Sequence, residues 1–314
     1  MRRAAGTGIR YVSGRLAQGL VVVLGAITIS FVLIHLTGNP AEVLAGGQMS
    51  REQVDQLSKQ LGYDRPLVVQ YVEYLGNVVH GDLGNSFRFE EPAIKSVSHA
   101  LPSTLLLVGT TILVACAFAI PTAVFSVRRR ESLPDRALRR GLILGQGMPE
   151  FWLGLVLVLL FSVKLGWLPS IGLNGPESLV LPVATLALPL TAMLVRLLRA
   201  ELLDIMTSDF VVALRSKGLT ENSILLRHGL RNALIPFVTF LALQIGWLIG
   251  GTIIVESVFV WPGIGTLALS AVKVRDLAVI QAIVIVVALA YVVLNLIVDL
   301  VMMWIDPRIR TGAR

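Results

Sequence analysis

Six long apolar runs restrict the fold of this chain more than any other feature of its sequence. A helix that crosses a bilayer needs about 20 mostly apolar residues at 1.5 Å of rise each. Hydrophobic residues make up 55% of the chain and charged residues 15%, whereas about a quarter of the residues in soluble domains are charged. The sequence therefore predicts one polytopic, all-α membrane domain, with spans at residues 16–36, 101–127, 138–165, 179–198, 236–260 and 277–305.

The lysines and arginines between the predicted spans favour one side of the membrane. They gather in the N-terminal segment, between the second and third spans, between the fourth and fifth spans, and in the C-terminal tail. Residues 172–178, between the third and fourth spans, contain neither. Because basic loops stay in the cytoplasm, six spans predict that both termini are cytoplasmic. These loops account for the net charge of +7, so we expect membrane lipid rather than nucleic acid as the surrounding partner.

Residues 37–100 are then predicted to form an insert outside the cytoplasm, with more acidic than basic side chains. Ser50 can cap a helix, and Gly62 can end it. A second helical pattern runs through residues 67–75, and the GDLG sequence at 81–84 marks a turn. We therefore expect a small folded cap between the first and second spans.

The sequence lacks the motifs of catalysis and metal binding. It contains no GxxxxGK[ST] phosphate loop, no HExxH motif and no paired cysteines. Its one cysteine, Cys116, lies in an apolar run and is interpreted as a packing residue. We expect no enzyme activity, no cofactor and no metal site in this chain.

Few ionisable residues fall inside the predicted spans, although such residues are often functional. They include Glu150, Glu256 and Asp299. For Glu256 and Asp299, an interhelical hydrogen bond and a role in a transport pathway are equally open. Carriers driven by protons or sodium need buried titrating groups or broken-helix ion sites, so the energy for transport is expected from outside this chain.

The loop at 209–236 combines a helical pattern, a glycine break and a second basic helix. Asp209 near the start and Arg215 near the end of the first helix suit its dipole. Gly218 can adopt the left-handed conformation that ends this helix, and Thr220 can cap the next one. The loop is either an amphipathic linker on the membrane surface or a docking element for a partner.

Several motifs, in order along nearly the whole chain, resemble those of one known family. DFVVALRSKGL at 209–219 and RHGLRNALIP at 227–236 are similar to the cytoplasmic coupling loop of the dipeptide and oligopeptide permease family, B-type subunit. Val212, Ala213 and Leu214 depart from the small or polar residues usual in that loop. Further resemblances are LGYDRP at 61–66, GDLGNS at 81–86, LPST at 101–104, VESVF at 255–259, PGIG at 262–265 and DPRIR at 306–310.

This resemblance implies a type I ABC importer permease fold in a bacterial-type inner membrane. It implies one permease domain over 1–314, with a cap insert at 37–100 and a coupling loop at 199–236. The implied partners are a second homologous permease, two ABC ATPase subunits or domains that carry ATP and Mg, and an extracytoplasmic peptide-binding protein. The implied substrates are dipeptides or oligopeptides, with glutathione or a nickel chelate as alternatives.

The resemblance also suggests roles for individual residues. The candidates for the ATPase contact are Asp209, Phe210, Leu214, Arg215, Lys217, Gly218 and Leu219. The candidates for the translocation path are Gln244, Glu256 and Asn295. The candidates for the binding-protein contact or the outer gate are Tyr71, Asp82 and Ser86. A self-sufficient carrier and a non-conducting membrane scaffold are the alternative functions from other classes.

Overall fold

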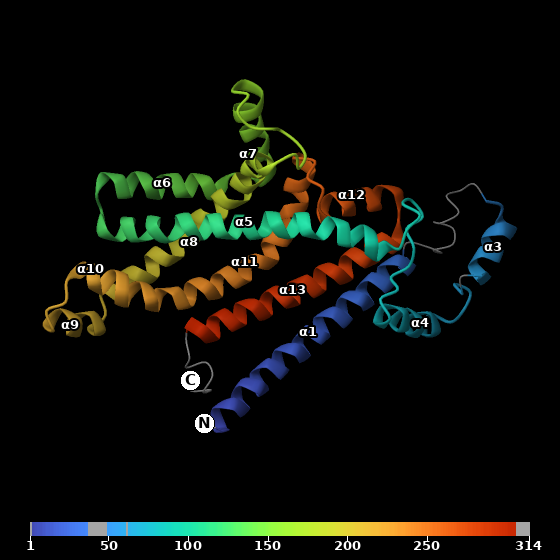
Figure 1. The fold of residues 1–314 in the computed structure, drawn as a ribbon, viewed down its shortest axis with the longest axis horizontal. Helices are drawn as coiled ribbons and strands as arrows, with labels where there is room; N and C mark the ends of the chain where they lie inside the picture. The colour runs from blue at the N-terminus through green and yellow to red at the C-terminus, as the bar shows by residue number, and fades with distance from the viewer. Residues whose placement is uncertain (1, 37–48, 61, 306–314) are drawn as a thin grey trace. The chain divides into compact units, whose positions relative to one another are not determined.

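The computed structural model of the chain describes residues 2–36, 49–60 and 62–305. Every regular element in those ranges is a helix, and extended pairing among them is limited to one bridge between Asn85 and Pro92 (Figure 1). The predicted all-α class is therefore confirmed. Residues 37–48 of the predicted cap and the DPRIR motif at 306–310 lie outside the described residues.

Five helices of the described chain are each long and apolar enough to cross a membrane. A sixth crossing arises if a bent pair of helices, α6 (Leu133–Gly147) and α7 (Glu150–Leu157), counts as one span, which brings the number to the six that the sequence predicts. The five helices are α1 (Arg2–Leu36), α5 (Ala93–Arg128), α8 (Val180–Met206), α11 (Leu230–Val258) and α13 (Leu277–Ile305).

The predicted third span at 138–165 corresponds to two helical segments joined by a sharp bend. The chain forms α6 (Leu133–Gly147), then α7 (Glu150–Leu157) and a π-helical turn (Val158–Lys164), with a bend of 106° between the two parts. Met148 and Pro149 are extended, with ψ of 126° and 136°. Proline disfavours the helical conformation of the residue before it and has no N–H to donate, so the helix breaks there.

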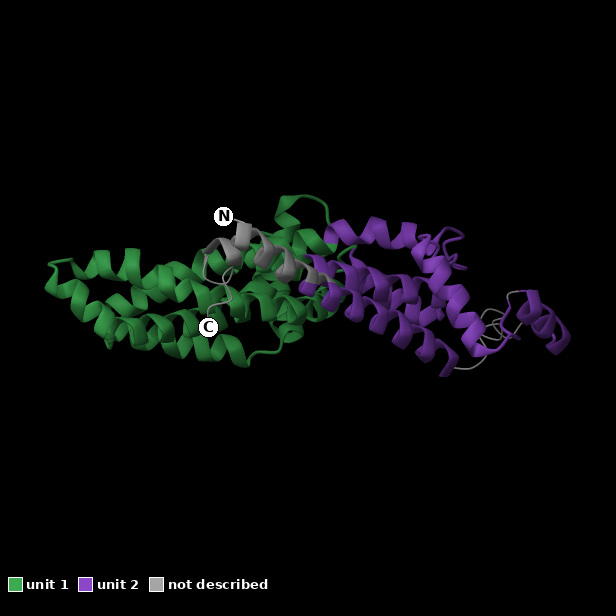
Figure 2. Cartoon of the chain, turned by 90° about the horizontal axis from the view of Figure 1, so that it is seen from below, with its two compact units in different colours: residues 1–7, 104–262, 294–314 green, residues 8–103, 263–293 purple. Residues whose placement is uncertain are grey.

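The described chain divides into two compact units (Figure 2). Unit 1 comprises residues 1–7, 104–262 and 294–314, and unit 2 comprises residues 8–103 and 263–293. The predicted single permease domain stays a prediction, and each unit is considered by itself below.

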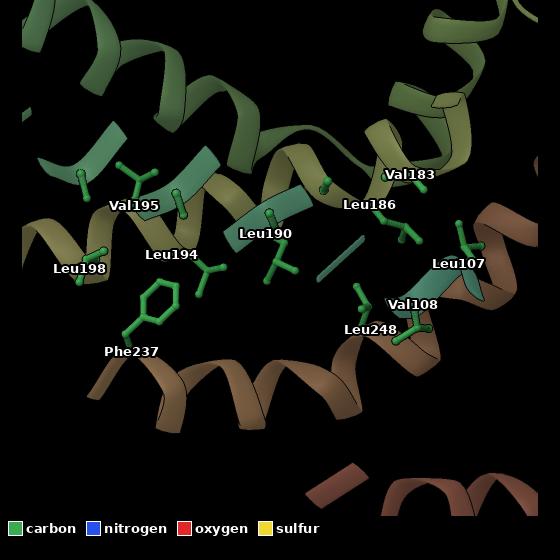
Figure 3. Packing of buried hydrophobic residues seen from close by; sticks show 14 of the residues in the cluster. Leu107, Val108, Val183, Leu186, Leu190, Leu194, Val195, Leu198, Phe237 and Leu248 are labelled. Atoms are coloured by element: carbon green, nitrogen blue, oxygen red, sulfur yellow. The ribbon is translucent and has the colours of Figure 1, made fainter. Parts of the chain in front are cut away.

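The core of unit 1 is built around α8. Leu186, Leu190, Leu194 and Leu198 recur every four residues along this helix and are fully buried. Figure 3 shows them facing side chains of neighbouring elements, among them Phe237 and Leu248 of α11. Helix association within a membrane depends on such close packing because lipid tails are as apolar as leucine.

Helix α5 joins this core through small residues. Ala115, Ala119 and Ala123 lie one turn apart and are fully buried. Small side chains let helix backbones approach each other closely, which is the usual solution for packed membrane helices.

Unit 2 has its own apolar core. Its buried side chains come from α1, α5, α13 and the short helix α12 (Ile264–Val274), which the sequence analysis does not predict. A Cβ at Gly19 of α1 would lie 2.6 Å from Cγ1 of Val292 on α13, so the close approach of the two helices at this point depends on the absence of a side chain at residue 19. Arg275, at φ 56°, ends α12 in the left-handed conformation just before α13 begins.

The predicted local signals of the cap are confirmed where the structure describes it. Ser50 precedes α3 (Arg51–Gln60): its Oγ accepts from the Gln53 N–H at 3.3 Å, and its own N–H donates to Gln53 Oε1 at 2.8 Å. Gly62 follows with φ 76°. The second helix is α4 (Leu67–Val79), and the turn after it has positive φ at Gly81 and Gly84.

Candidate coupling surface and pathway residues

The loop that follows α8 has the helix, break and cap that the sequence predicts (Figure 1). Helix α9 (Asp209–Ser216) ends just before Gly218, whose φ is 79°. Thr220 Oγ1 then accepts from the Ser223 N–H at 3.4 Å and caps α10 (Glu221–Ser223). A π-helical turn (Ile224–Gly229) leads directly into α11.

Buried residues hold this loop against the rest of unit 1. Val211, the third residue of α9, is buried. Ile224 and Leu225 of the π-helical turn are buried as well. A Cβ at Gly229 would lie 3.4 Å from the Ile224 carbonyl oxygen and 3.8 Å from Cδ2 of Leu202 on α8. The π-helical turn of the loop is thus packed against the end of α8.

Other apolar side chains of the loop are exposed. Phe210 is 47% exposed, Val212 55% and Leu226 45%. Phe210 also makes an edge contact with the His228 ring, with centroids 6.3 Å apart. Leu214 and Leu219 are half-buried, whereas Asp209, Lys217 and Gly218 are exposed. We call Phe210, Val212 and Leu226 the coupling surface; sequence reasoning selected only the first of them.

Arg215 is engaged within the loop. Its Nε and Nη2 donate to Oε1 and Oε2 of Glu221 at 2.6 and 3.1 Å, a two-bond pairing across the Gly218 turn. The hydrogen bond with Glu221 raises the pKa of Arg215 above its ordinary value. The sequence predicts Arg215 as a charge for the partner and Glu221 as a first-turn residue of the second helix, but not the pairing of the two, which braces the break between α9 and α10.

The three candidates for the translocation path do not form one cluster. Gln244 and Glu256 are 12 residues apart on α11, about 18 Å along an α-helix. Gln244 Nε2 is 3.2 Å from Met193 Sδ on α8. Glu256 is buried, and its Oε1 accepts a hydrogen bond from Thr104 Oγ1 of α5 at 2.6 Å. Of the two roles predicted for Glu256, the structure therefore shows the interhelical hydrogen bond. Asn295 is half-buried on α13.

The candidates for the outer surface have different environments within unit 2. The Tyr71 hydroxyl is 2.6 Å from Thr28 Oγ1 of α1, and Asp82 is exposed with its Oδ1 accepting from the Gly84 N–H at 3.0 Å. Ser86 is buried and donates to Asp276 Oδ2 at 2.6 Å. The two predicted roles of these residues, binding-protein contact and outer gate, stay predictions.

Asp276 is a residue that the sequence analysis missed. Its Oδ1 accepts from the Val279 N–H at 3.2 Å, so it caps α13 while its other oxygen holds Ser86. An aspartate immediately before a long apolar run is the signal that could have revealed it.

A second missed residue, Asp135, joins three helices of unit 1. It is fully buried and accepts from Ser126 Oγ of α5 and from the Glu131 N–H, the latter at 3.1 Å. It also pairs with Arg199 of α8 at 3.3 Å and with Arg139 of α6 at 3.4 Å. The loop between α5 and α6 is therefore tied to α8, the helix against which the coupling loop packs.

The residues that the structure describes contain no group of three or more His, Cys, Asp or Glu side chains placed to hold a metal ion.

Two known families match the chain, together over residues 8–311. Residues 98–311 match the family described as "Binding-protein-dependent transport system inner membrane component". Residues 8–108 match the family described as "Binding-prot-dependent transport system membrane comp, N-term".

Individual relatives agree with the family match. The chain is 37% identical over 304 residues to the glutathione transport system permease protein GsiC of Escherichia coli. The match covers 96% of this chain and 99% of that permease. The protein of the same name from Shigella dysenteriae has the same identity and coverage.

The fold agrees with that of a solved transporter, the inward-facing MetNI methionine ABC transporter, which is known in two crystal forms. One matches with a TM-score of 0.56 and 18% identity over 67% of this chain and 96% of that chain, and the other with a TM-score of 0.51. At this identity the likeness shows the fold alone. The sequence match and the fold together show that this chain belongs to the family of binding-protein-dependent transport system inner membrane components and is an ABC importer permease subunit of the dipeptide and oligopeptide type, with the type I fold, and not an enzyme.

Proposed function

We propose that this permease forms half of the translocation pathway of an ATP-driven importer for short peptides, with glutathione, itself a tripeptide, as the first substrate to test. The observation that carries the proposal is the 37% identity to glutathione permeases over almost the full length of both chains. Dipeptides and longer peptides are the wider class, and a nickel chelate is the alternative substrate within the family.

The chain works with partners in this proposal. A second, similar permease completes the pathway, an extracytoplasmic binding protein delivers the peptide, and two ATPases supply the energy from ATP and Mg. Both termini and the loop at 199–236 lie in the cytoplasm, where the coupling surface meets an ATPase. The exposed apolar side chains Phe210, Val212 and Leu226 support this role because docking depends mainly on apolar burial.

The packing of the loop supports a mechanical role. Closure of the ATPases on ATP pushes on α9, and the buried Val211, Ile224 and Leu225 pass that movement to α8. The Arg215–Glu221 pair keeps α9 and α10 in one orientation during the push. Movement of α8 then changes access to the pathway, and ATP hydrolysis resets it.

Uptake by the reconstituted importer tests the substrate. The permease, its partner permease, both ATPases and the binding protein are placed in liposomes, and ATP-driven uptake of glutathione, a dipeptide and a nickel chelate is compared. We expect uptake of glutathione or the dipeptide, and none when the ATPases are omitted. Uptake of the nickel chelate alone would overturn the peptide assignment, and uptake without ATPases would show a self-sufficient carrier.

Two exposed valines test the coupling surface. Val212→Asp places a charge on the coupling surface, whereas Val79→Asp places one on α4 of the external cap, where the valine is 82% exposed. We expect Val212→Asp to fold normally but to lose most ATPase co-purification and peptide-stimulated ATP turnover, and Val79→Asp to keep both. Wild-type levels of both in Val212→Asp would contradict the docking role.

A further inference from the structure

A pocket of about 480 Å³ lies where the start of α7 meets α11. Its lining includes Glu150 and Phe151 from α7, and Trp247 and Gly251 from α11. The volume lies within the range of about 300–1,000 Å³ that is usual for small-molecule sites. Among the described residues of the lining, Glu150 alone is charged, so it determines which ligand chemistry the pocket suits.

The Glu150 carboxylate lacks a protein partner on one side. Its Oε1 atom is buried and makes no hydrogen bond to any residue that the structure describes. Buried polar atoms in proteins are nearly always bonded, because an unpaired one costs free energy, and a charged group inside a membrane costs more. Glu150 is the first residue of α7, where the positive end of the helix dipole favours a negative charge. The fold thus keeps an acceptor beside a pocket without supplying the donor.

Gly251 makes room for this carboxylate. A Cβ at residue 251 would lie 2.9 Å from Glu150 Oε2 and 3.4 Å from Oε1. Real Cβ atoms do not approach an oxygen that closely, so an alanine there would push the carboxylate aside. The position of the acceptor therefore depends on the absence of a side chain on the facing helix.

The other walls suit a cation. Phe151 and Trp247 line the same pocket, and the faces of aromatic rings attract ammonium groups, most strongly for tryptophan. A carboxylate flanked by aromatic residues combines a charge-assisted hydrogen bond with cation–π attraction. Free peptides, glutathione included, carry a primary ammonium group at their α-amino end. We infer that the Glu150 pocket is a subsite that holds the free ammonium group of a peptide during translocation, an inference that rests on the proposed function.

Substrates with free and blocked amino groups test the subsite. Initial rates of ATP-driven uptake of glutathione and N-acetylglutathione are measured with the complete importer in liposomes at saturating binding protein. Glu150→Gln removes the charge and keeps the size, and Gly251→Ala displaces the carboxylate. We expect the ratio of the glutathione rate to the N-acetylglutathione rate to fall by about tenfold in both variants. This is the order of effect of one charge-assisted hydrogen bond.

Gly145→Ala is the matched control, because residue 145 lies in α6 outside the pocket and its Cβ would meet nothing within 4 Å. We expect it to keep the wild-type ratio. If the wild-type importer takes up glutathione and the Glu150→Gln variant keeps the wild-type ratio, the subsite is overturned and the proposed function stands. Wild-type importer that takes up no peptide overturns the proposed function and the subsite with it.

Two further measurements apply even if the binding protein rejects the blocked peptide. Labelling of Glu150 by dicyclohexylcarbodiimide, read by mass spectrometry of the purified wild-type complex, should be slowed by glutathione and not by N-acetylglutathione. Equal labelling in the presence of either peptide overturns the subsite. Loss of the second permease from the purified Glu150→Gln complex also overturns it, because Glu150 would then pair with a cation of that subunit.

Discussion

At the scale of single residues, Asp135 shows how a buried charge can be tolerated in a largely apolar protein. The carboxylate is fully buried, yet it accepts hydrogen bonds from Ser126 and the Glu131 backbone and pairs with Arg139 and Arg199. Removing one partner of such a pair leaves the other charge uncompensated, which costs about 3–5 kcal/mol. We expect Asp135→Ala to lower the free energy of unfolding in detergent by that order.

The matched control is Asp204→Ala, since Asp204 is an exposed aspartate of α8 in the same unit. Surface substitutions of this kind change stability by about 0.5 kcal/mol or less. Urea unfolding followed by tryptophan fluorescence measures both variants. Equal midpoints for Asp135→Ala and Asp204→Ala would contradict a stabilising role for the Asp135 cluster.

At the scale of elements, Asp276 connects the loop after α4 to the start of α13. One of its oxygens caps α13 at the Val279 N–H, and the other accepts from Ser86. We expect Asp276→Ala to cost about 1–3 kcal/mol, because it removes a helix cap and leaves the buried Ser86 hydroxyl without this acceptor. Hydrogen exchange should then rise at the backbone amides of Ser86 and Val279.

Asp276→Asn provides the comparison for this element. Asparagine caps helices about as well as aspartate, so the exchange at Val279 should stay close to that of the wild type. If Asp276→Ala also left the exchange of both amides unchanged, the hydrogen bonds of Asp276 would not be what holds the loop to α13.

At the scale of the whole molecule, the proposed topology places the coupling loop and the cap on opposite sides of the membrane. A Cys116→Ala background removes the one native cysteine, which is half-buried in α5. We expect Lys217→Cys to react with a membrane-impermeant maleimide only in inside-out vesicles, and Asp55→Cys only in right-side-out vesicles. Reaction of both from the same side would refute the topology.

The sequence by itself determined the features that depend on a few neighbouring residues. The apolar runs predict where most membrane helices lie, because spanning a bilayer requires a minimum apolar length. Ser50, Gly62, Gly218 and Thr220 begin or end helices as predicted, because capping and left-handed backbone geometry are local properties. The motifs of the coupling loop also led to the correct family.

Only the tertiary structure decided the contacts between residues that are distant in the chain. Ser86 and Asp276 are 190 positions apart, and Thr104 and Glu256 are 152 apart, so no local pattern pairs them. The adjacent valines 211 and 212 look alike in sequence, yet the first is buried and the second exposed. The break at Pro149 and the acceptor at Glu150 lie within one apolar run, whose length predicts a span but not the bend in it. The physical reason is that local chemistry selects the helices, whereas the packing of one helix against another selects the partner of each side chain and the face that is buried.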